Sequence, residues 1–70
     1  MYRRKTLYAI EAPGGALFLE GEEVLIVCMD GSVVTGEISH VGASVVMIHD
    51  GTIDFKDIKD IKDIKRGGVK

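Results

Sequence analysis

Few side chains in this 70-residue sequence could act as a nucleophile, a general base or a soft-metal ligand. Cys28 is the only cysteine, and the two histidines are His40 and His49. Cys28 lies inside the most apolar run of the chain, where a thiol packs as a small hydrophobic group. We therefore expect Cys28 to belong to the core, and we interpret the chain as a protein without catalysis.

The same residues do not have the spacing of a metal site. Cys28, His40, His49 and Asp50 form neither a C-x-x-C nor an H-x-x-x-H pattern. The glycines match neither of the two common phosphate-binding patterns, G-x-x-x-x-G-K-[S/T] and G-x-G-x-x-G. The sequence thus predicts no metal ion and no cofactor, and both histidines are expected at solvent-facing strand ends.

Charge is distributed unevenly along the chain. Residues 1–10 hold three bases and no acid, residues 11–40 hold six acids and no base, and the formal net charge is −2. A protein that binds duplex DNA generally has a net basic field, so this class is disfavoured. Two local basic stretches, 3–5 and 65–66, are the candidates for nucleic-acid contacts, and the first is better explained as a solvated terminus.

Between residues 21 and 64 the sequence has the pattern of short strands joined by tight turns. Asp30-Gly31 and Asp50-Gly51 are typical hairpin-turn dipeptides, and Gly42-Ala43 is a third turn. Four strands are predicted beside these turns, at 24–29, 33–41, 44–49 and 53–55. This spacing favours an all-β meander that bends into a small barrel of about five strands.

Gly36 interrupts the longest of these predicted strands. Val34 and Ile38 share its face, whereas Thr35 and Glu37 lie on the opposite face. A strand position without a side chain often marks a sharp bend. We therefore expect the sheet to curl at Gly36.

A Lys-Asp-Ile triplet occurs three times in succession over residues 56–64. Its apolar residues recur every three positions, a period that suits neither a strand nor an α-helix. The pattern predicts a 3-10 turn at 56–58 followed by a strand from about residue 60 to 65, with a short C-terminal helix as the alternative. The isoleucines are expected in the core and the alternating charges in solvent.

A chain this short forms a thin core, and its single cysteine excludes an internal disulfide. The runs 24–29 and 45–48 are apolar on both faces, so the second face of each needs a cover. We therefore expect a homo-oligomer. The predicted organisation is an N-terminal segment, 1–20, that packs on or completes a barrel at 21–66, followed by a tail at 67–70; the residues of the N-terminal segment favour extended structure, with a helical turn as the alternative.

No apolar run approaches the ~20 residues of a membrane-spanning helix. No apolar stretch of signal-peptide length follows the basic start. Together with the single unpaired cysteine, these features favour a cytoplasmic protein without a membrane role.

Several short motifs occur in a fixed order along residues 21–69. They begin with Gly21, Val24 and Ile26, continue with Asp30-Gly31, Gly36 and Ile38, and end with Ile64, Arg66, Gly67 and Val69. This order resembles the Sm-like family of small barrels, which includes the LSm proteins and Hfq. The chain departs from that pattern at Lys65, which is inserted, at Gly42, where the family has Asp, and at Val46, where the family has the Asn that hydrogen-bonds a base.

The resemblance implies an oligomeric ring of SH3-like or Sm-like barrels whose neighbours pair their edge strands, with single-stranded RNA bound near the pore. It implies that Arg66 contacts RNA, with Lys65, Gly67 and Ser44 as further candidates. Valine at position 46 cannot replace the missing amide contact.

Two function classes follow from these observations. The first is a small oligomeric Sm-like RNA-binding or RNA-chaperone-type module. The second is an SH3-like barrel that binds or scaffolds a protein partner and has no nucleic-acid role; the acidic balance, the missing asparagine and the two-faced apolar strands favour it. Neither class includes catalysis.

Overall fold

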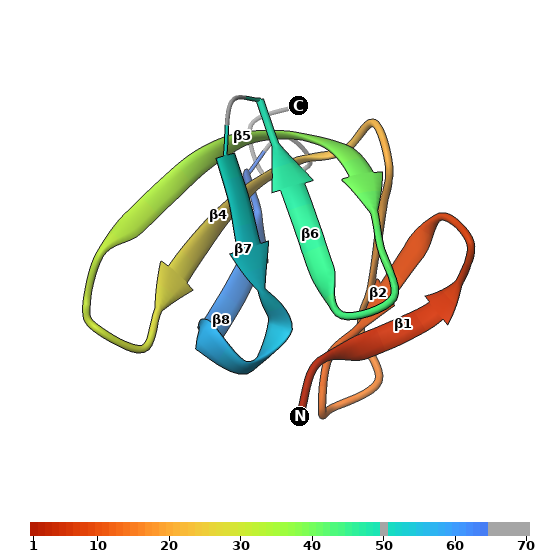
Figure 1. The fold of residues 1–70 in the computed structure, drawn as a ribbon, viewed down its shortest axis with the longest axis horizontal. Coiled ribbons are helices and arrows are strands. Elements are labelled where there is room, and N and C mark those ends of the chain that lie inside the picture. Colours follow the sequence, from red (N-terminus) through yellow and green to blue (C-terminus); the bar gives the residue numbers. More distant parts are fainter. Residues whose placement is uncertain (50, 65–70) are drawn as a thin grey trace.

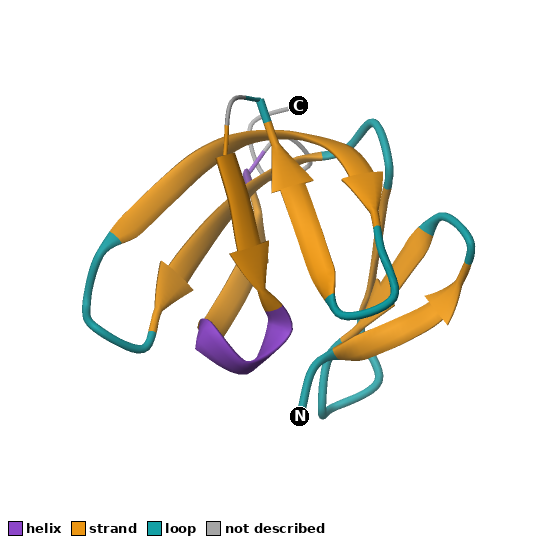
Figure 2. Cartoon of the chain, in the orientation of Figure 1, coloured by secondary structure: helices purple, strands orange, loops and turns teal. Residues whose placement is uncertain are grey.

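Strands dominate the computed structural model, which describes residues 1–49 and 51–64 (Figure 1). The strands are β1 (Arg3–Thr6), β2 (Ala9–Glu11), β3 (Leu17–Leu19), β4 (Glu23–Cys28), β5 (Val33–Val41), β6 (Val45–Ile48), β7 (Gly51–Asp54) and β8 (Ile58–Asp63). A 3-10 helix, η1 (Phe55–Asp57), joins β7 to β8 and is the purple turn between them in Figure 2. The predicted all-β class and the 3-10 turn before the last strand are confirmed. Within these ranges no helix has the length and apolar character needed to cross a membrane.

The strands form two antiparallel sheets. The smaller sheet has the order β1-β2-β3, and the larger has the order β7-β6-β5-β4-β8. Among the described residues, five strands lie in the region predicted as a barrel, and the N-terminal segment adds three more. The larger sheet curls strongly, as Figure 1 shows, but its edge strands β7 and β8 do not pair with each other, so strand pairing does not close it into a barrel in the described part of the chain.

The curl of the larger sheet lies in strand β5. Its first half pairs with β4, from Val33 to Glu37, and its second half pairs with β6, from Ile38 to Val41. Gly36 lies near the change of partner with a φ of +154°, and a Cβ there would stand 2.8 Å from Cγ2 of Ile48. The backbone conformation and the close approach both exclude a larger side chain at Gly36, and β5 arches over its length in Figure 1, in agreement with the predicted curl.

Both sheets contribute to a single hydrophobic core. The smaller sheet supplies Ile10 and Phe18, which belong to the same cluster of buried residues as the larger sheet's side chains. The larger sheet and η1 supply Val24, Ile26, Ile38, Val41, Val46, Ile48, Phe55, Ile58 and Ile61. The N-terminal segment is therefore part of the folded unit, since its strands cover apolar residues of the larger sheet.

The period of three in the C-terminal repeat is explained by a β-bulge. Ile61 pairs with Ile26 and Asp60 with Val27, but the register then shifts so that Ile58 pairs with Cys28. A regular strand would place Ile58 and Ile61 on opposite faces, whereas the extra residue of the bulge brings both into the core. The strand consequently begins at Ile58, two residues earlier than predicted. Ile64, the third isoleucine expected in the core, is 38% exposed, so that part of the prediction is wrong.

The N-terminal segment is extended but not as one strand. Leu7 and Tyr8 form a turn between β1 and β2, so the apolar run over residues 6–10 contributes to two strands. The buried residues of this run, Ala9 and Ile10, lie in β2. Extended structure was the favoured prediction for this segment, and the turn within it was not predicted.

The two predicted Asp-Gly turns differ in detail. In the first, the N–H of Gly31 donates to the C=O of Cys28 over 2.9 Å, with a φ of +92° at Gly31. Both the N–H and the hydroxyl of Ser32 donate to Oδ1 of Asp30, and these bonds lower the pKa of that carboxyl. In the second, Gly51 already pairs with Ile48 as part of β7. Asp50 lies outside the described residues.

Candidate interaction site at the strand edges

The predicted RNA-binding residues fall mostly outside the described part of the chain. Lys65, Arg66 and Gly67 lie beyond residue 64, so their placement is not described. Ser44 is exposed in the connection between β5 and β6, and its C=O accepts a hydrogen bond from the N–H of Phe55 over 2.9 Å. Ser44 also lines a hollow of about 450 Å³ beside Tyr2 and Phe55. Its backbone therefore has a structural role in holding η1 against the β5–β6 connection.

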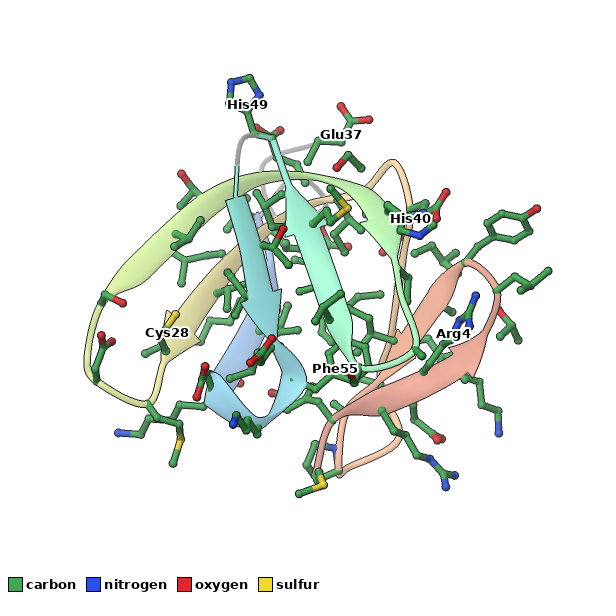
Figure 3. The ribbon with its side chains drawn as sticks, in the orientation of Figure 1. Arg4, Cys28, Glu37, His40, His49 and Phe55 are labelled. Atoms are coloured by element: carbon green, nitrogen blue, oxygen red, sulfur yellow. The ribbon has the colours of Figure 1, made fainter. Side chains whose placement is uncertain are left out.

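The residues with possible chemical reactivity do not converge. Figure 3 places Cys28, His40 and His49 on different parts of the molecule. Cys28 is half-buried against the core, and both histidines are exposed at strand ends, as predicted. Across residues 1–49 and 51–64, no three His, Cys, Asp or Glu side chains lie close enough to hold a metal ion.

The free edge of β8 is covered by the start of the chain. The hydroxyl of Tyr2 accepts a hydrogen bond from the N–H of Ile61 over 3.1 Å and donates to Oδ1 of Asp60 over 3.4 Å. Tyr2 is itself buried, and burial, followed by the charge of Asp60, raises the pKa of its phenol. A side chain thus occupies a position where an incoming strand would bond to β8.

The outer edge of β3 is covered by its own chain. The N–H of Leu19 donates to Oε1 of Glu22 over 3.0 Å, and the C=O of Leu19 accepts from the N–H of Glu22 over 3.0 Å. Glu20, which follows β3, accepts from the N–H of Val41 and lies 3.5 Å from Nδ1 of His40. These contacts join the end of β3 to β5 and occupy the outward-facing backbone groups of Leu19.

The edge of β7 is different. Phe55 N–H donates to Ser44 C=O, so the pair Ser44–Phe55 is hydrogen-bonded. Hydrogen-bonded and non-hydrogen-bonded pairs alternate along an antiparallel ladder. Thr52 and Asp54 therefore occupy the non-bonded positions opposite Met47 and Val45, and their N–H and C=O groups face away from β6. No strand pairs with that side of β7 in the described part of the chain.

A hollow of about 550 Å³ lies along this edge; we call it the seam hollow. Three consecutive β7 residues, Thr52 to Asp54, all line it. Because consecutive strand residues point to opposite faces, lining by all three places the hollow at the strand's edge. The opposite wall comes from the β4–β5 hairpin and η1, and the full lining is Cys28, Met29, Asp30, Ser32, Val34, Thr52, Ile53, Asp54 and Asp57.

The seam hollow has an apolar base and an acidic rim. Cys28, Val34 and Ile53 are partly buried residues that pack against the core. Asp30, Asp54 and Asp57 are exposed and supply three carboxylates, and the lining includes no lysine or arginine. The hydrogen bonds from the hydroxyl and N–H of Ser32 hold the pKa of Asp30 below its usual range and so favour the charged carboxylate.

Two further surface features lie on the smaller sheet. Leu7, Tyr8, Leu17 and Leu19 are between 44% and 62% exposed. Arg4 is half-buried, and its Nε is a buried side-chain polar atom without a hydrogen-bond partner. By contrast, Nη2 of Arg3 lies 2.9 Å from Oε1 of Glu11, and Nζ of Lys5 lies 4.0 Å from Oε2 of the same carboxylate.

Sequence reasoning did not identify the seam hollow or the role of Tyr2. For the hollow, the sequence offered only acidic residues beside the ends of apolar strands. For Tyr2, it offered only a tyrosine, an amphipathic residue type, close to the first residue. What the arrangement offers is recognition: strand edges, an apolar base and fixed charges, without a converging acid, base and nucleophile among the described residues. Comparison of the chain with protein-family models, with curated proteins and with solved structures finds no match.

Proposed function

We propose that this chain is a non-catalytic, SH3-like or Sm-like small barrel that binds a protein partner. The strand order β7-β6-β5-β4-β8, the sharing of β5 between two halves and the 3-10 turn before β8 support the barrel architecture. A cytoplasmic location belongs to the same proposal, because Cys28 has no disulfide partner within the chain.

The observation that carries this proposal is the contrast among the strand edges. Leu19 on β3 and Ile61 on β8 have side-chain partners, whereas β7 presents outward-facing backbone groups at Thr52 and Asp54 beside the seam hollow. An uncovered strand edge is a template for pairing with another chain. Strand addition is also a common way for a small domain to bind a protein segment.

The net charge of the chain favours protein over nucleic acid as the partner. The chain holds eleven acidic and nine basic residues, a formal net charge of −2. Nucleic-acid binding depends largely on cations that neutralise phosphates. An acidic surface opposes that contact and complements basic protein segments.

A direct comparison of ligand classes tests the proposal. The full-length protein is titrated into a library of labelled extended peptides and, separately, into labelled oligouridine and oligoadenine RNA, with binding followed by fluorescence anisotropy. We expect saturable binding to members of the peptide library and none to RNA at about 0.15 M salt. Saturable binding to RNA together with no binding to any peptide would overturn the proposal.

The second candidate is the Sm-like oligomeric RNA-binding module. Lys59 and Lys62 are exposed on β8, and the same spacing continues in the sequence to Lys65 and then Arg66. A line of cations in each subunit of a homo-oligomer could follow a single-stranded RNA backbone. This candidate requires Arg66→Ala to weaken RNA binding without changing stability.

The oligomeric state separates the two candidates further. A ring built by pairing β7 of one subunit with β8 of the next would have to displace Tyr2 from Ile61. Light scattering at low and high salt measures the mass: a closed ring supports the Sm-like candidate, and a monomer or dimer supports the interaction module.

A further inference from the structure

We propose that the β7 edge and the seam hollow together bind an extended, lysine- or arginine-containing segment of a partner protein, added to the larger sheet as a strand next to β7. The inference rests on the proposed interaction function and names both the place and the class of the ligand. The β7 edge supplies the backbone bonds, the base of the hollow supplies apolar contact, and the rim selects the charge.

The backbone of β7 is the first part of the argument. The N–H and C=O groups of Thr52 and Asp54 face away from β6, because these residues occupy the non-bonded positions of the β6–β7 ladder. They lie two residues apart, so one extended segment can exchange hydrogen bonds with both. The segment would continue the order of the larger sheet beyond β7.

The base of the seam hollow is the second part. Alternate side chains of a strand beside β7 point to the same face, so one set would enter the hollow. There they would meet Cys28, Val34 and Ile53, which are partly exposed and already pack against the core. Covering these side chains removes apolar surface from water and so favours the complex.

The rim of the hollow is the third part and selects the occupant. Asp30, Asp54 and Asp57 lie on the β4–β5 turn, at the end of β7 and in η1, so their carboxylates surround the hollow from three elements. An acidic segment would be repelled, and a lysine or arginine would lie close to a carboxylate. A second copy's β7 is a poorer occupant, because it would bring its own Asp54 towards these carboxylates.

The experiment uses two matched probes with the full-length protein. One is a fluorescein-labelled hexapeptide of alternating valine and lysine, and the other has glutamate in place of lysine. We expect saturable binding of the lysine peptide, at least about tenfold stronger than the glutamate peptide at low salt. Equal affinity for the two peptides would overturn the charge selection.

Two pairs of variants locate the binding site. The double variant Asp54→Asn and Asp57→Asn should weaken binding of the lysine peptide about tenfold, whereas the control double variant Glu23→Gln and Glu37→Gln, at exposed acids outside the hollow, should change it less than about twofold. Thr52→Pro, which removes one outward N–H at an edge position, should weaken binding about tenfold or more, whereas Thr52→Val keeps the N–H and should retain binding. A Thr52→Pro protein that is folded and binds with unchanged affinity would contradict the strand-addition mode.

Amide hydrogen exchange provides a test that needs no variant. Addition of the lysine peptide to the unaltered protein should slow exchange at Thr52 and Asp54 and leave Leu19 and Ile61 unchanged. Protection of Thr52 and Asp54 that depends on protein concentration alone would identify a second copy as the occupant and overturn the inference. If other peptides of the library bind but the lysine peptide does not, the inference fails while the proposed interaction function stands.

Discussion

The two outer strands of the larger sheet differ in whether their outward-facing backbone groups have hydrogen-bond partners. Both β7 and β8 end the sheet and therefore present backbone groups to the surroundings. On β8, the hydroxyl of Tyr2 accepts from the N–H of Ile61, whereas Thr52 and Asp54 on β7 face a hollow with an acidic rim. Natural sheets usually protect their edges against aggregation. The proposed binding function rests on this open edge beside a chemically distinct hollow.

The largest expected effect concerns the curl of β5 at Gly36. Gly36→Val places a side chain at a φ of +154° with its Cβ 2.8 Å from Cγ2 of Ile48. We expect the free energy of unfolding to fall by about 3 kcal/mol or more, because backbone strain and overpacking add together. Urea unfolding measures the loss.

The control for this substitution is Gly14→Ala. An added Cβ at Gly14 meets no atom within 4 Å, and the expected change is within about 0.5 kcal/mol. Equal effects of the two substitutions would show that Gly36 does not determine the curl, and the comparison of the two edges would lose its structural basis.

The next effect tests the covered edge directly. Tyr2→Phe leaves the buried N–H of Ile61 without its acceptor, at an expected cost of about 1–2 kcal/mol in unfolding free energy. Hydrogen exchange at Ile61 should become faster. Tyr8→Phe is the matched control, because Tyr8 is 59% exposed and its hydroxyl does not cover a strand edge. Unchanged exchange at Ile61 in the Tyr2→Phe protein would refute the covering role.

The same contact predicts a pH dependence. The pKa of Tyr2 is raised above its ordinary value of 10.0, first by burial and then by the charge of Asp60. The folded state therefore favours the neutral phenol, so its contribution to stability is complete below pH 10 and is lost as pH rises through the folded-state pKa. Urea unfolding across this range should show a steeper decline for the unaltered protein than for Tyr2→Phe. Parallel curves for the two proteins would contradict the prediction.

The smallest effect concerns the third edge. Glu22→Ala removes the carboxylate that accepts from the N–H of Leu19. Since the bond is exposed, we expect a loss of only about 0.5 kcal/mol, with faster hydrogen exchange at Leu19 as the clearer signal. Glu23→Ala, at an exposed neighbouring acid, is the control and should leave that exchange rate unchanged. If Leu19 exchanges equally fast in both variants, β3 is as open as β7 and the contrast between covered and open edges weakens.

Local sequence patterns predicted much of the larger sheet. The strand at 33–41, its inward face with Val34 and Ile38, and the bend at Gly36 agree with the structure, because β-branched residues, alternation and a mid-strand glycine act locally. The Asp30-Gly31 turn agrees for the same reason. The strand at 24–29 was predicted with the right length but shifted by one residue, since β4 runs from Glu23 to Cys28 and Met29 already belongs to the turn.

The candidate site was much less predictable. Three of the four residues expected to contact RNA lie outside the described residues, and the fourth, Ser44, is exposed and bonds through its backbone. The seam hollow combines residues that are distant in the sequence, such as Val34 and Ile53. These residues meet only because β5 curls. A period of three in the repeat also concealed the bulge that buries Ile58 and Ile61 together.

Residue types and their spacing were sufficient to define the all-β class, the turn at Asp30-Gly31 and the bend at Gly36, because each depends on the conformational preferences of a few neighbouring residues. The choice of which strand edge is open depends on contacts that no local pattern contains. Tyr2 reaches Ile61 across 59 positions of sequence, while Thr52 and Asp54 have no such partner on their outward side among the described residues. Packing of the smaller sheet against the larger one decides that difference, since it alone brings the start of the chain to the edge of β8.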